Sequence, residues 1–342
     1  MDGSFTDCNV LNDRSFIAVL LLDGFSSLSL GAIMEPFAMA RSEFPGHLPE
    51  MRLVGFTDRC VRSASGMEVM CGLDAETVLE KMFGPCGPQS MIICGPTDTP
   101  YKRDKRLIDL LRKVSRSGTH ICGIGNVTWA MAEAGLLGNS GATVHWKSLA
   151  AFQEANPSTD TRNALFVTNG SVGTCAGELA TLDMIIQLIS VNAPQAVRKV
   201  MNRLLISQPR LGSSLQPGSQ CERLRHLPPI LSQAAKTMAE NIEYPLSTSE
   251  IAGRCNCSLR QIERLFRKYL NSTPKQYYDS LKVERAIELI SQTDLPLREV
   301  ALASGFQALA TLAKKLKQIH GKTPNEIRDL LARSEFGKLL EA

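Results

Sequence analysis

The sequence contains no hydrophobic run long enough to span a membrane. The longest early run, Phe16–Leu22, has no cluster of basic residues leading into it and runs into Asp23, whereas a membrane helix needs roughly 20 apolar residues. This run therefore predicts a buried strand. We expect no membrane contact and a cytoplasmic location.

Paired cysteines are also missing. Ten cysteines are scattered singly along the chain except for Cys255 and Cys257, and neither a CxxC pair nor a secretion signal occurs. These spacings argue against a zinc site and a disulfide framework, so we expect reduced, mostly buried thiols, no metal site and no cofactor. Tracts rich in Pro, Ser and Glu are absent too, which argues against extensive disorder.

Positive charge is concentrated in the last third of the chain. Residues 219–342 hold 19 Lys and Arg against 14 Asp and Glu, whereas residues 1–218 hold 19 against 20. Such asymmetry favours a nucleic-acid-binding module in the last third, although an excess of this size also occurs on inert surfaces.

Between residues 16 and 191, short apolar runs alternate with amphipathic segments. This alternation predicts parallel βαβ units and a covered sheet. The strand candidates are Phe16–Leu22, Met51–Thr57, Ser90–Cys94, Thr119–Ile124 and Leu165–Thr168. The helix candidates, from their 3.6-residue spacing, are Lys105–Val114, Val127–Ala134, Lys147–Glu154 and Gly177–Leu188.

A stretch rich in Gly, Ser, Gln and Pro separates this region from the rest. No periodic pattern persists between Arg210 and Pro229, and only helical patterns follow it. A chain of 342 residues also exceeds a usual single core. We predict an α/β domain over residues 14–209, a linker over 210–229 and an all-α domain over 230–332.

Two segments of the C-terminal region share a layout. Each has a short helix with a small inner residue, Ala252 or Ala301, and then a turn residue suited to positive φ, Asn256 or Gly305. A second amphipathic helix follows. Asn and Gly enter the left-handed region at least cost, and a helix-turn-helix needs such a corner.

The helix predicted over Leu259–Tyr269 has one apolar and one basic face. Ser258 is placed to cap its N-terminus. Its apolar stripe is formed by Ile262, Leu265, Phe266 and Tyr269, and its outward side chains are Arg260, Gln261, Arg264, Arg267 and Lys268. An exposed face of Arg and Gln can read base edges in the major groove.

The stretch from about Pro245 to Arg328 resembles the AraC/XylS-type DNA-binding domain, in which a long central helix joins two helix-turn-helix units. The matching text includes "SLRQIERLFRKYLNSTPKQYYDSLKVERAIELI", "TDLPLREVALASGF" and "HGKTPNEIR". The resemblance implies that the base-reading positions of the first unit fall on Arg260, Glu263 and Arg264.

The second unit departs from the family's pattern. Where the family usually has a Ser cap, polar base-facing residues and two aromatic core positions, this chain has Ala308, Leu309, Ala310, Leu312 and Leu316. Leu and Ala offer a thymine methyl contact but no hydrogen bond, so we expect this unit mainly to grip phosphates. The predicted DNA contacts are Ser258, Arg260, Gln261, Glu263, Arg264, Arg267, Lys268, Gln307, Leu309, Thr311, Lys314, Lys315 and Lys317.

The N-terminal region resembles the PfpI-type branch of the class I glutamine-amidotransferase-like fold, in particular the sensor half of GlxA-type AraC regulators. The resemblance rests on "FIAVLLLDGFSSLSLGAIMEPFAMA", "ASGMEV", "AMAEAGLLGNSGATVHW" and "TCAGELATLDMIIQLI". It implies a parallel, flavodoxin-like sheet. Enzymes of that superfamily carry a nucleophilic Cys on a strand-to-helix elbow, but Gly125 occupies that position here, so we expect no enzyme.

Neither Cys122 nor the nearby histidines replace the missing nucleophile and base. Cys122 lies three residues before Gly125, inside a predicted strand, and no His follows it to act as a base. We therefore expect a buried, inert thiol. The pair of His145 and Trp146 is common in this sensor family, and we expect His145 to be structural or ligand-lining.

The fold places a ligand pocket at the C-terminal ends of the parallel strands, where helix N-termini direct free amides outward. A carboxylate and an indole converging there would suit a small cationic metabolite. Alternatively, Glu35 is a solvated helix charge and Trp129 a core residue. The candidate lining residues are Ser26, Glu35, Ser65, Asn126, Thr128, Trp129, His145, Trp146, Thr174 and Cys175.

These features together predict a sequence-specific transcriptional regulator, and specifically an activator that responds to an amino-acid derivative or a quaternary amine. Its expected partners are duplex DNA, the effector, RNA polymerase and a second copy of the chain. Two alternatives stay open. One is an amidase or deglycase-like hydrolase with an incidental DNA-binding tail, and the other is a DNA-binding protein whose α/β domain only dimerises.

Overall fold

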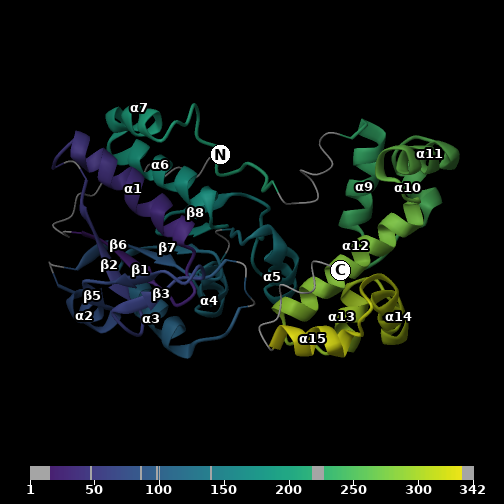
Figure 1. Cartoon of the computed structure of the whole chain (residues 1–342), viewed down its shortest axis with the longest axis horizontal. Helices are drawn as coiled ribbons and strands as arrows, with labels where there is room; N and C mark the ends of the chain where they lie inside the picture. The colour runs from purple at the N-terminus through teal and green to yellow at the C-terminus, as the bar shows by residue number, and fades with distance from the viewer. Residues whose placement is uncertain are drawn as a thin grey trace. The chain divides into compact units, whose positions relative to one another are not determined.

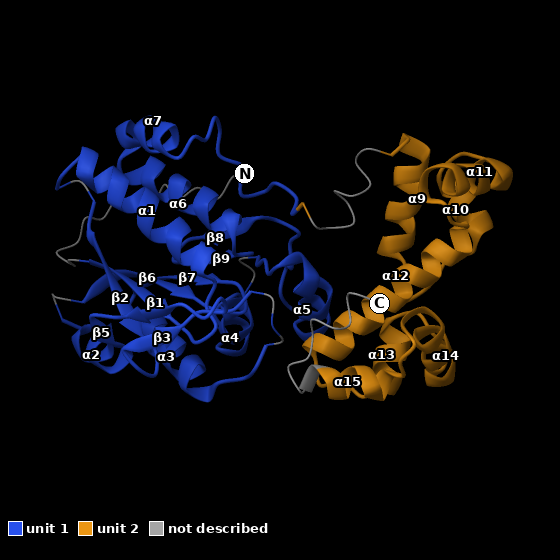
Figure 2. Cartoon of the chain, in the orientation of Figure 1, with its two compact units in different colours: residues 1–216 blue, residues 217–342 orange. Residues whose placement is uncertain are grey.

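The chain divides into two compact units, Met1–Gln216 and Pro217–Ala342, which Figure 2 distinguishes by colour. The computed structural model describes residues 16–46, 48–84, 87–97, 99, 101–138, 141–217 and 227–332. Residues 14–15 of the predicted α/β domain and residues 218–226 of the predicted linker lie outside the described residues. The two units are described separately below.

The first unit is built on a sheet whose strand order is β5-β2-β1-β6-β7-β9-β8. All neighbouring strands pair in parallel except β8, which runs antiparallel to β9 at one edge. This order confirms the predicted flavodoxin-like α/β class. The strands of the sheet are β1 (Phe16–Leu21), β2 (Glu50–Gly55), β5 (Leu73–Asp74), β6 (Pro88–Cys94), β7 (His120–Ile124), β8 (Phe166–Asn169) and β9 (Val172–Cys175).

Helices cover both faces of this sheet, as a parallel sheet requires. On one face lie α1 (Ser27–Glu43), α6 (Leu179–Asn192) and α7 (Pro194–Arg203), and on the other lie α2 (Ala75–Lys81), α3 (Lys105–Arg116) and α4 (Val127–Glu133) (Figure 1). A short 3₁₀ helix, η2 (Trp146–Ser148), leads into α5 (Leu149–Ala155). All six residues of β1 are buried, so its apolar run fills the centre of the core.

Several elements of this unit were not predicted from the sequence. They are β5, β9 and a small antiparallel hairpin of β3 (Cys60–Arg62) and β4 (Glu68–Met70), together with α2 and α7. These strands have two to four residues, which is too short for a reliable two-residue alternation. The strand β9, which lies between β7 and the edge strand β8, matters most, because it leads into the N-terminus of α6.

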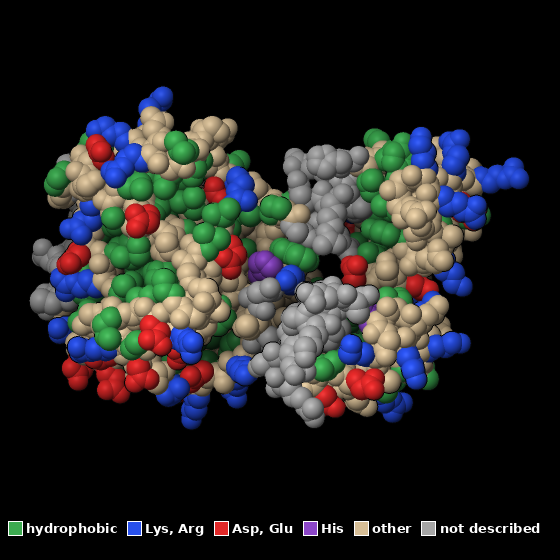
Figure 3. Space-filling view, in the orientation of Figure 1, with side chains coloured by type: hydrophobic (Ala, Val, Ile, Leu, Met, Phe, Trp, Pro, Cys, Tyr) green, Lys and Arg blue, Asp and Glu red, His purple; other side chains and the backbone are tan. Residues whose placement is uncertain are grey.

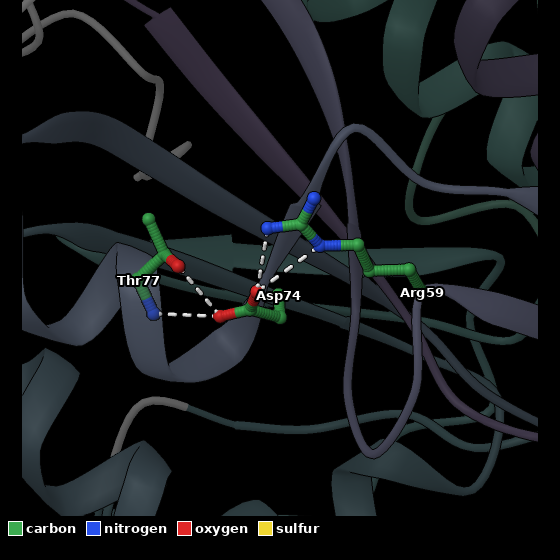
Figure 4. A network of polar contacts seen from close by, with 3 residues as sticks. All are labelled: Arg59, Asp74 and Thr77. Carbon is green, nitrogen blue, oxygen red and sulfur yellow. Dashed lines mark hydrogen bonds and ion pairs between the residues drawn. The ribbon is translucent and has the colours of Figure 1, made fainter.

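A local polar network fixes the start of α2 (Figure 4). The Asp74 carboxylate accepts hydrogen bonds from the backbone N–H and the hydroxyl of Thr77, at 2.8 and 2.7 Å. The other carboxylate oxygen accepts two bonds from the Arg59 guanidinium, at 3.2 and 3.0 Å. The bonds from Thr77 and then Arg59 lower the pKa of Asp74 to about 2. Asp74 therefore caps α2 as a carboxylate.

Residues 210–216, which the sequence assigned to the linker, belong to the first unit. Backbone N–H groups of Leu165 and of Phe166, the first residue of β8, donate to the carbonyl oxygens of Gly212 and Ser214 at 2.9 to 3.3 Å. Gln216 is buried with only 2% of its surface exposed. Lack of periodicity therefore marked an irregular segment here rather than a detached one.

The second unit contains only helices among its described residues 227–332. They are α9 (Pro229–Glu240), α10 (Thr248–Arg254), α11 (Leu259–Leu270), α12 (Pro274–Gln292), α13 (Leu297–Ala303), α14 (Leu309–His320) and α15 (Pro324–Ala332). This confirms the predicted all-α class. The long helix α12 packs against α9, α11, α13, α14 and α15, so it joins two helix pairs, α10–α11 and α13–α14.

The loop after α9 connects the two helix pairs. The Tyr278 hydroxyl on α12 donates to the Asn241 carbonyl at 2.5 Å and accepts from the Leu246 N–H at 3.3 Å. The Ile242 carbonyl in the same loop lies against Gly305 in the second helix pair. Side chains from α9, α10, α11 and α12 form one hydrophobic cluster around Ile251 and Phe266.

No helix within the described residues is both long and apolar enough to cross a membrane.

Candidate nucleic-acid interface and ligand site

The first helix pair has the corner that its sequence predicted. A capping box starts α10, in which the Ser247 hydroxyl accepts from the Glu250 N–H and the Glu250 carboxylate accepts from the Ser247 N–H. Asn256, in the turn, has a φ of 50°. Ala252 is buried at the inner side of the corner. Together these features set α10 and α11 as a helix-turn-helix.

Helix α11 exposes a cationic face. The Ser258 hydroxyl accepts from the Gln261 N–H at 3.2 Å and so caps the helix, as predicted, while Ile262 and Phe266 are fully buried. On the opposite side a shallow hollow of about 440 Å³ is lined by Arg260, Glu263, Arg264, Arg267 and Lys268. Figure 3 shows Lys and Arg side chains gathered over this helix.

The guanidinium groups on this face are available to an anionic partner. Arg260, Arg264 and Arg267 are exposed, and none of them pairs with a carboxylate of the described residues within 4.0 Å. Gln261 is half-buried. Arg presents a planar fork of donors that matches a guanine edge or a phosphate, so this face can both bind and discriminate duplex DNA.

The apolar stripe predicted for α11 is wrong at one residue. Tyr269 is 46% exposed, and the Lys268 ammonium lies over its ring at 5.0 Å from the centroid. Position 269 falls at the last turn, where the helix ends at Asn271 with a φ of 47°. The stripe there has passed the edge of the core, so the ring faces solvent.

The second helix pair repeats the corner but lacks the cap. Gly305 takes a φ of 70°, and Leu312 and Leu316 are buried where the family usually has aromatics. Ala308 occupies the N-cap position of α14 and offers no side-chain hydrogen bond. Gln307, Thr311, Lys314 and Lys317 are exposed, and Leu309 is half-buried.

Lys315 is not as free as the other lysines of α14. Its ammonium forms an ion pair with the Asp279 carboxylate of α12 at 2.6 Å and is half-buried. A DNA phosphate would therefore have to compete with the Asp279 carboxylate for the Lys315 ammonium, which weakens the predicted phosphate contact of Lys315. Lys314 and Lys317 remain the exposed cations of this helix.

Adding a cap to α14 is expected to stabilise the second unit. Ala308 has φ and ψ of −150° and 146°, an extended conformation that suits an N-cap residue. The Ala308→Ser variant should raise the free energy of unfolding by about 1 kcal/mol, and Ser258→Ala, which removes the matching cap of α11, should lower it by about 1 kcal/mol. Urea titration followed by circular dichroism measures both, and equal midpoints for the wild type and Ala308→Ser would contradict the expectation.

The elbow between β7 and α4 has no room for a nucleophile. Gly125 has a φ of 68°, and a Cβ at this position would lie 2.5 Å from the Pro96 carbonyl oxygen and 3.1 Å from the Thr97 methyl group. The backbone thus has the strained elbow that the resemblance implied, but the loop after β6 fills the space where a side chain would project. A cysteine there would collide with backbone.

The cysteines near the elbow are protonated; Cys94 and Cys175 are buried and Cys122 is partly buried. Burial raises the pKa of the Cys122 thiol, whose Sγ lies 3.3 Å from the Met184 Sδ. Burial likewise raises the pKa of Cys94 and Cys175 to about 12. The nucleophilic form of a cysteine is its thiolate, so these groups are inert at neutral pH, as predicted for Cys122.

Glu178, which the sequence did not single out, is a carboxylate at the C-terminal edge of the sheet. It follows β9 with φ and ψ of 51° and −134°, a conformation that costs a residue other than glycine about 1–3 kcal/mol. Its two carboxylate oxygens accept from the Ser26 hydroxyl at 2.8 Å and the Thr97 hydroxyl at 2.6 Å. The Glu178 N–H donates to the Ser29 hydroxyl at 2.8 Å.

Glu35 and Cys175 of the predicted ligand set point away from this edge, whereas Ser65 lies beside it through its bond to Ser27, the neighbour of Ser26. Glu35 is exposed two turns into α1, so it is the solvated helix charge of the alternative interpretation. Ser65 is exposed in the β3–β4 turn, bonded to Ser27 and Ser63. Cys175 packs into the core with α1 and α6, because neighbouring residues on a strand point to opposite faces.

The other predicted ligand residues gather around the start of α4. The Asn126 side chain bonds to the Thr99 carbonyl, and the Thr128 hydroxyl donates to the Thr143 carbonyl at 3.2 Å. The Thr174 hydroxyl accepts from the Thr143 N–H at 3.0 Å. Ser26, at the start of α1, reaches the same edge through Glu178.

Aromatic rings flank this group. Trp129 is 5% exposed and stacks on Tyr101 with ring centroids 5.6 Å apart, while Phe152 meets it edge-on at 5.1 Å. Its indole Nε1 is buried without a hydrogen-bond partner within the described residues. His145 and Trp146 lie together, with centroids 5.6 Å apart. Most of the Trp129 surface therefore belongs to the core.

Comparison with known proteins assigns the chain to a family. A family model described as a helix-turn-helix domain matches residues 251–329. The HTH-type transcriptional regulator CdhR of Pseudomonas aeruginosa is 30% identical over 314 residues, which cover 91% of this chain and 91% of that protein. The regulator GlxA of Rhizobium meliloti is 29% identical and covers 91% and 95%, and GbdR of Pseudomonas aeruginosa is 29% identical and covers 91% and 83%.

These relatives extend across both units and are named as regulators of transcription. A role in transcription agrees with the paired helix-turn-helix units of the second unit. It also agrees with the elbow of the first unit, where glycine stands in place of the nucleophilic cysteine. The chain belongs to the GlxA-type AraC/XylS family of DNA-binding transcriptional regulators.

Proposed function

We propose that this regulator reads its operator mainly through α11, with α14 gripping the backbone, and that its α/β unit binds a small cationic metabolite. In this proposal the chain acts in the cytoplasm as a homodimer and activates transcription by engaging RNA polymerase. The effector belongs to the amino-acid derivatives or quaternary amines. The observation that carries the DNA part is the exposed, unpaired guanidinium face of α11.

The division of labour between the two helices follows from their surfaces. Arg260, Glu263 and Arg264 on α11 carry donors and an acceptor that discriminate base pairs. The exposed groups of α14 include two lysines, Lys314 and Lys317, which bind phosphate as point charges. Specificity should therefore be concentrated in the part of the operator that α11 occupies.

The effector part rests on Glu178. A strained residue that other elements hold in place is a common mark of a functional position, and Glu178 is held by hydroxyls from two separate loops. Its carboxylate supplies the charge that an organic cation favours, and the partly exposed rings of His145 and Trp146 are candidates for the aromatic face. Glu178 replaces Glu35 in this role.

The experiment compares the full chain with a fragment of residues 217–342. Duplex DNA selected from a random library provides the operator, and arginine, spermidine and choline provide the effector classes. We expect both proteins to bind the operator with an affinity that falls steeply with salt. Only the full chain should show a higher melting temperature with one of the amines and a changed promoter output.

Three outcomes would refute parts of this proposal. Identical promoter output from the full chain and the fragment, with no shift in melting temperature, would replace the sensor by a unit that only dimerises. Binding to selected and random DNA with equal affinity would remove the sequence-specific role of α11. If a Glu178→Gln variant keeps both the rise in melting temperature and the change in promoter output, the amine is bound by another carboxylate.

A further inference from the structure

The last segment of the first unit, residues 205–216, is held against it at separate points. We call this segment the strap. Near its middle, the Arg210 backbone N–H and guanidinium bond to the Asp183 carboxylate at 2.8 and 2.7 Å, and Asp183 is buried on α6. Gly212 lies so close to the Phe166 ring that a Cβ would meet it at 2.7 Å.

The strap ends in a buried glutamine. The Gln216 Nε2 donates to the carbonyl oxygens of Val144 and Ala164 at 2.8 and 2.9 Å and to the Thr143 hydroxyl at 3.2 Å. Leu211 and Leu215, by contrast, are exposed. Pro217 is the first residue of the second unit, so this one side chain fixes the point at which the chain leaves the α/β unit.

Thr143 connects this anchor to the sheet edge described above. Its N–H donates to the Thr174 hydroxyl on β9 at 3.0 Å, and its carbonyl accepts from the Thr128 hydroxyl on α4 at 3.2 Å. Its own hydroxyl donates to the Ala164 carbonyl at 2.8 Å. Thr128, Thr143, Thr174 and Gln216 are all at least 98% buried.

We propose that the strap detaches and reattaches as a unit, and that Gln216 is the positioning residue through which the start of α4 controls it. This inference rests on the proposed effector function, whose candidate residues include Thr128 and Thr174. A ligand that shifts α4 or β9 would move Thr143, and Thr143 would then hold or release Gln216. Release would free residues 205–216 to lengthen the tether of the DNA-binding unit.

The chemistry of the anchor makes it suitable for such a switch. When the Gln216 amide leaves, the single Thr143 hydroxyl proton can serve only one of the Val144 and Ala164 carbonyls. The buried carbonyl left without a donor gives the docked and released states a clear difference in free energy. The strap is otherwise exposed and irregular, and segments with few buried apolar contacts open at low cost. The strap is therefore expected to occupy one of two states, docked or released, rather than to shift gradually.

Hydrogen exchange in the full chain tests this inference without any effector. The Leu165 and Phe166 amides donate to strap carbonyls, so they exchange faster when the strap detaches. In Gln216→Leu we expect them to exchange about tenfold faster or more, since one buried hydrogen-bonded amide has been removed. Gln216→Asn, which retracts the amide by one methylene, should give a smaller acceleration.

A matched control and a double-mutant cycle separate coupling from general loosening. Gln208→Leu makes the same chemical change at an exposed strap position and should leave both amides unchanged, as should amides of β1 in every variant. Thr128→Val should accelerate the two amides about threefold in the wild-type chain and add less than about twofold in Gln216→Leu. Independent, multiplying effects would overturn the coupling.

The effector arm distinguishes failure of this inference from failure of the proposed function. With whichever of arginine, spermidine or choline raises the melting temperature, Gln216→Leu should keep that rise but lose the change in promoter output. A normal promoter response in Gln216→Leu, or exchange no faster than in Gln208→Leu, refutes the strap mechanism. If none of the amines binds, the proposed sensor fails, and the exchange cycle still decides whether the strap is coupled to α4.

Discussion

Replacing Gly305 with alanine is expected to lower the free energy of unfolding of the C-terminal unit by about 2–5 kcal/mol. Gly305 has a φ of 70°, and a Cβ there would lie 1.9 Å from the Ile242 carbonyl oxygen and 3.0 Å from the Pro245 Cγ. The left-handed conformation costs an L-residue about 1–2 kcal/mol. Relief of the clash costs about 1–3 kcal/mol more, because the nearest atom is backbone.

Gly253 provides the matched control. It lies in α10 of the same unit, and a Cβ there meets nothing within 4 Å, so Gly253→Ala should stabilise the unit by about 0.5–1 kcal/mol. Both tryptophans, Trp129 and Trp146, lie in the first unit. Their fluorescence therefore follows that unit alone during urea unfolding, whereas far-ultraviolet circular dichroism follows the helices of both units, so a transition seen by circular dichroism and not by fluorescence reports the second unit.

The Gly305→Ala substitution should also weaken DNA binding, since the corner at Gly305 sets the angle between α13 and α14. The close approach of Gly305 to the loop after α9 links the second helix pair to the first. A Gly305→Ala chain with the wild-type unfolding midpoint would show that the Ile242 carbonyl can move away from residue 305 without loss of stability. Position 305 would then not require glycine.

Arg264→Ala is expected to reduce discrimination between the operator and random duplex DNA by about 1–3 kcal/mol, which is the usual value of a bidentate base contact. Arg264 is exposed at the centre of the cationic face of α11, between Arg260 and Arg267. Its guanidinium has no internal partner among the described residues that DNA would have to displace. Fluorescence anisotropy with both duplexes at matched salt measures the difference.

Arg264→Lys separates geometry from charge. The lysine keeps the positive charge, so affinity for random DNA should stay within about twofold of the wild type, but it lacks the planar fork of donors. Discrimination should therefore fall almost as far as in Arg264→Ala. If the two duplexes lose affinity equally in the alanine variant, Arg264 contacts only phosphate, and base reading must be assigned to Arg260 or Glu263.

Local sequence signals predicted the DNA-binding unit well. Asn256 and Gly305 at the two corners, Ser258 as a cap and Ala252 and Ala301 at the inner faces all lie where their residue types suggest. A helix-turn-helix is specified by residues within about 20 positions of one another, and caps and positive-φ turns act over a single helical turn. Such features are visible in sequence because their causes are local.

The α/β unit shows where this reasoning stops. The sequence indicated the sheet class and the empty elbow at Gly125, but it selected Glu35 as the carboxylate of the ligand edge. Glu178 was passed over because the short strand β9 was not predicted. Without that strand, the sequence places the residue in a helix rather than after a strand at the C-terminal edge of the sheet.

By itself the sequence determined the division into an α/β and an all-α unit, the two corners of the DNA-binding unit and the absence of a nucleophile at the elbow. Only the tertiary structure decided that Glu178 meets Ser26 across 152 residues, that Gln216 meets Thr143 across 73 and that Lys315 meets Asp279 across 36. Periodicity and capping report on neighbours within a few residues. These partners are brought together by strand order and helix packing, which no local pattern encodes.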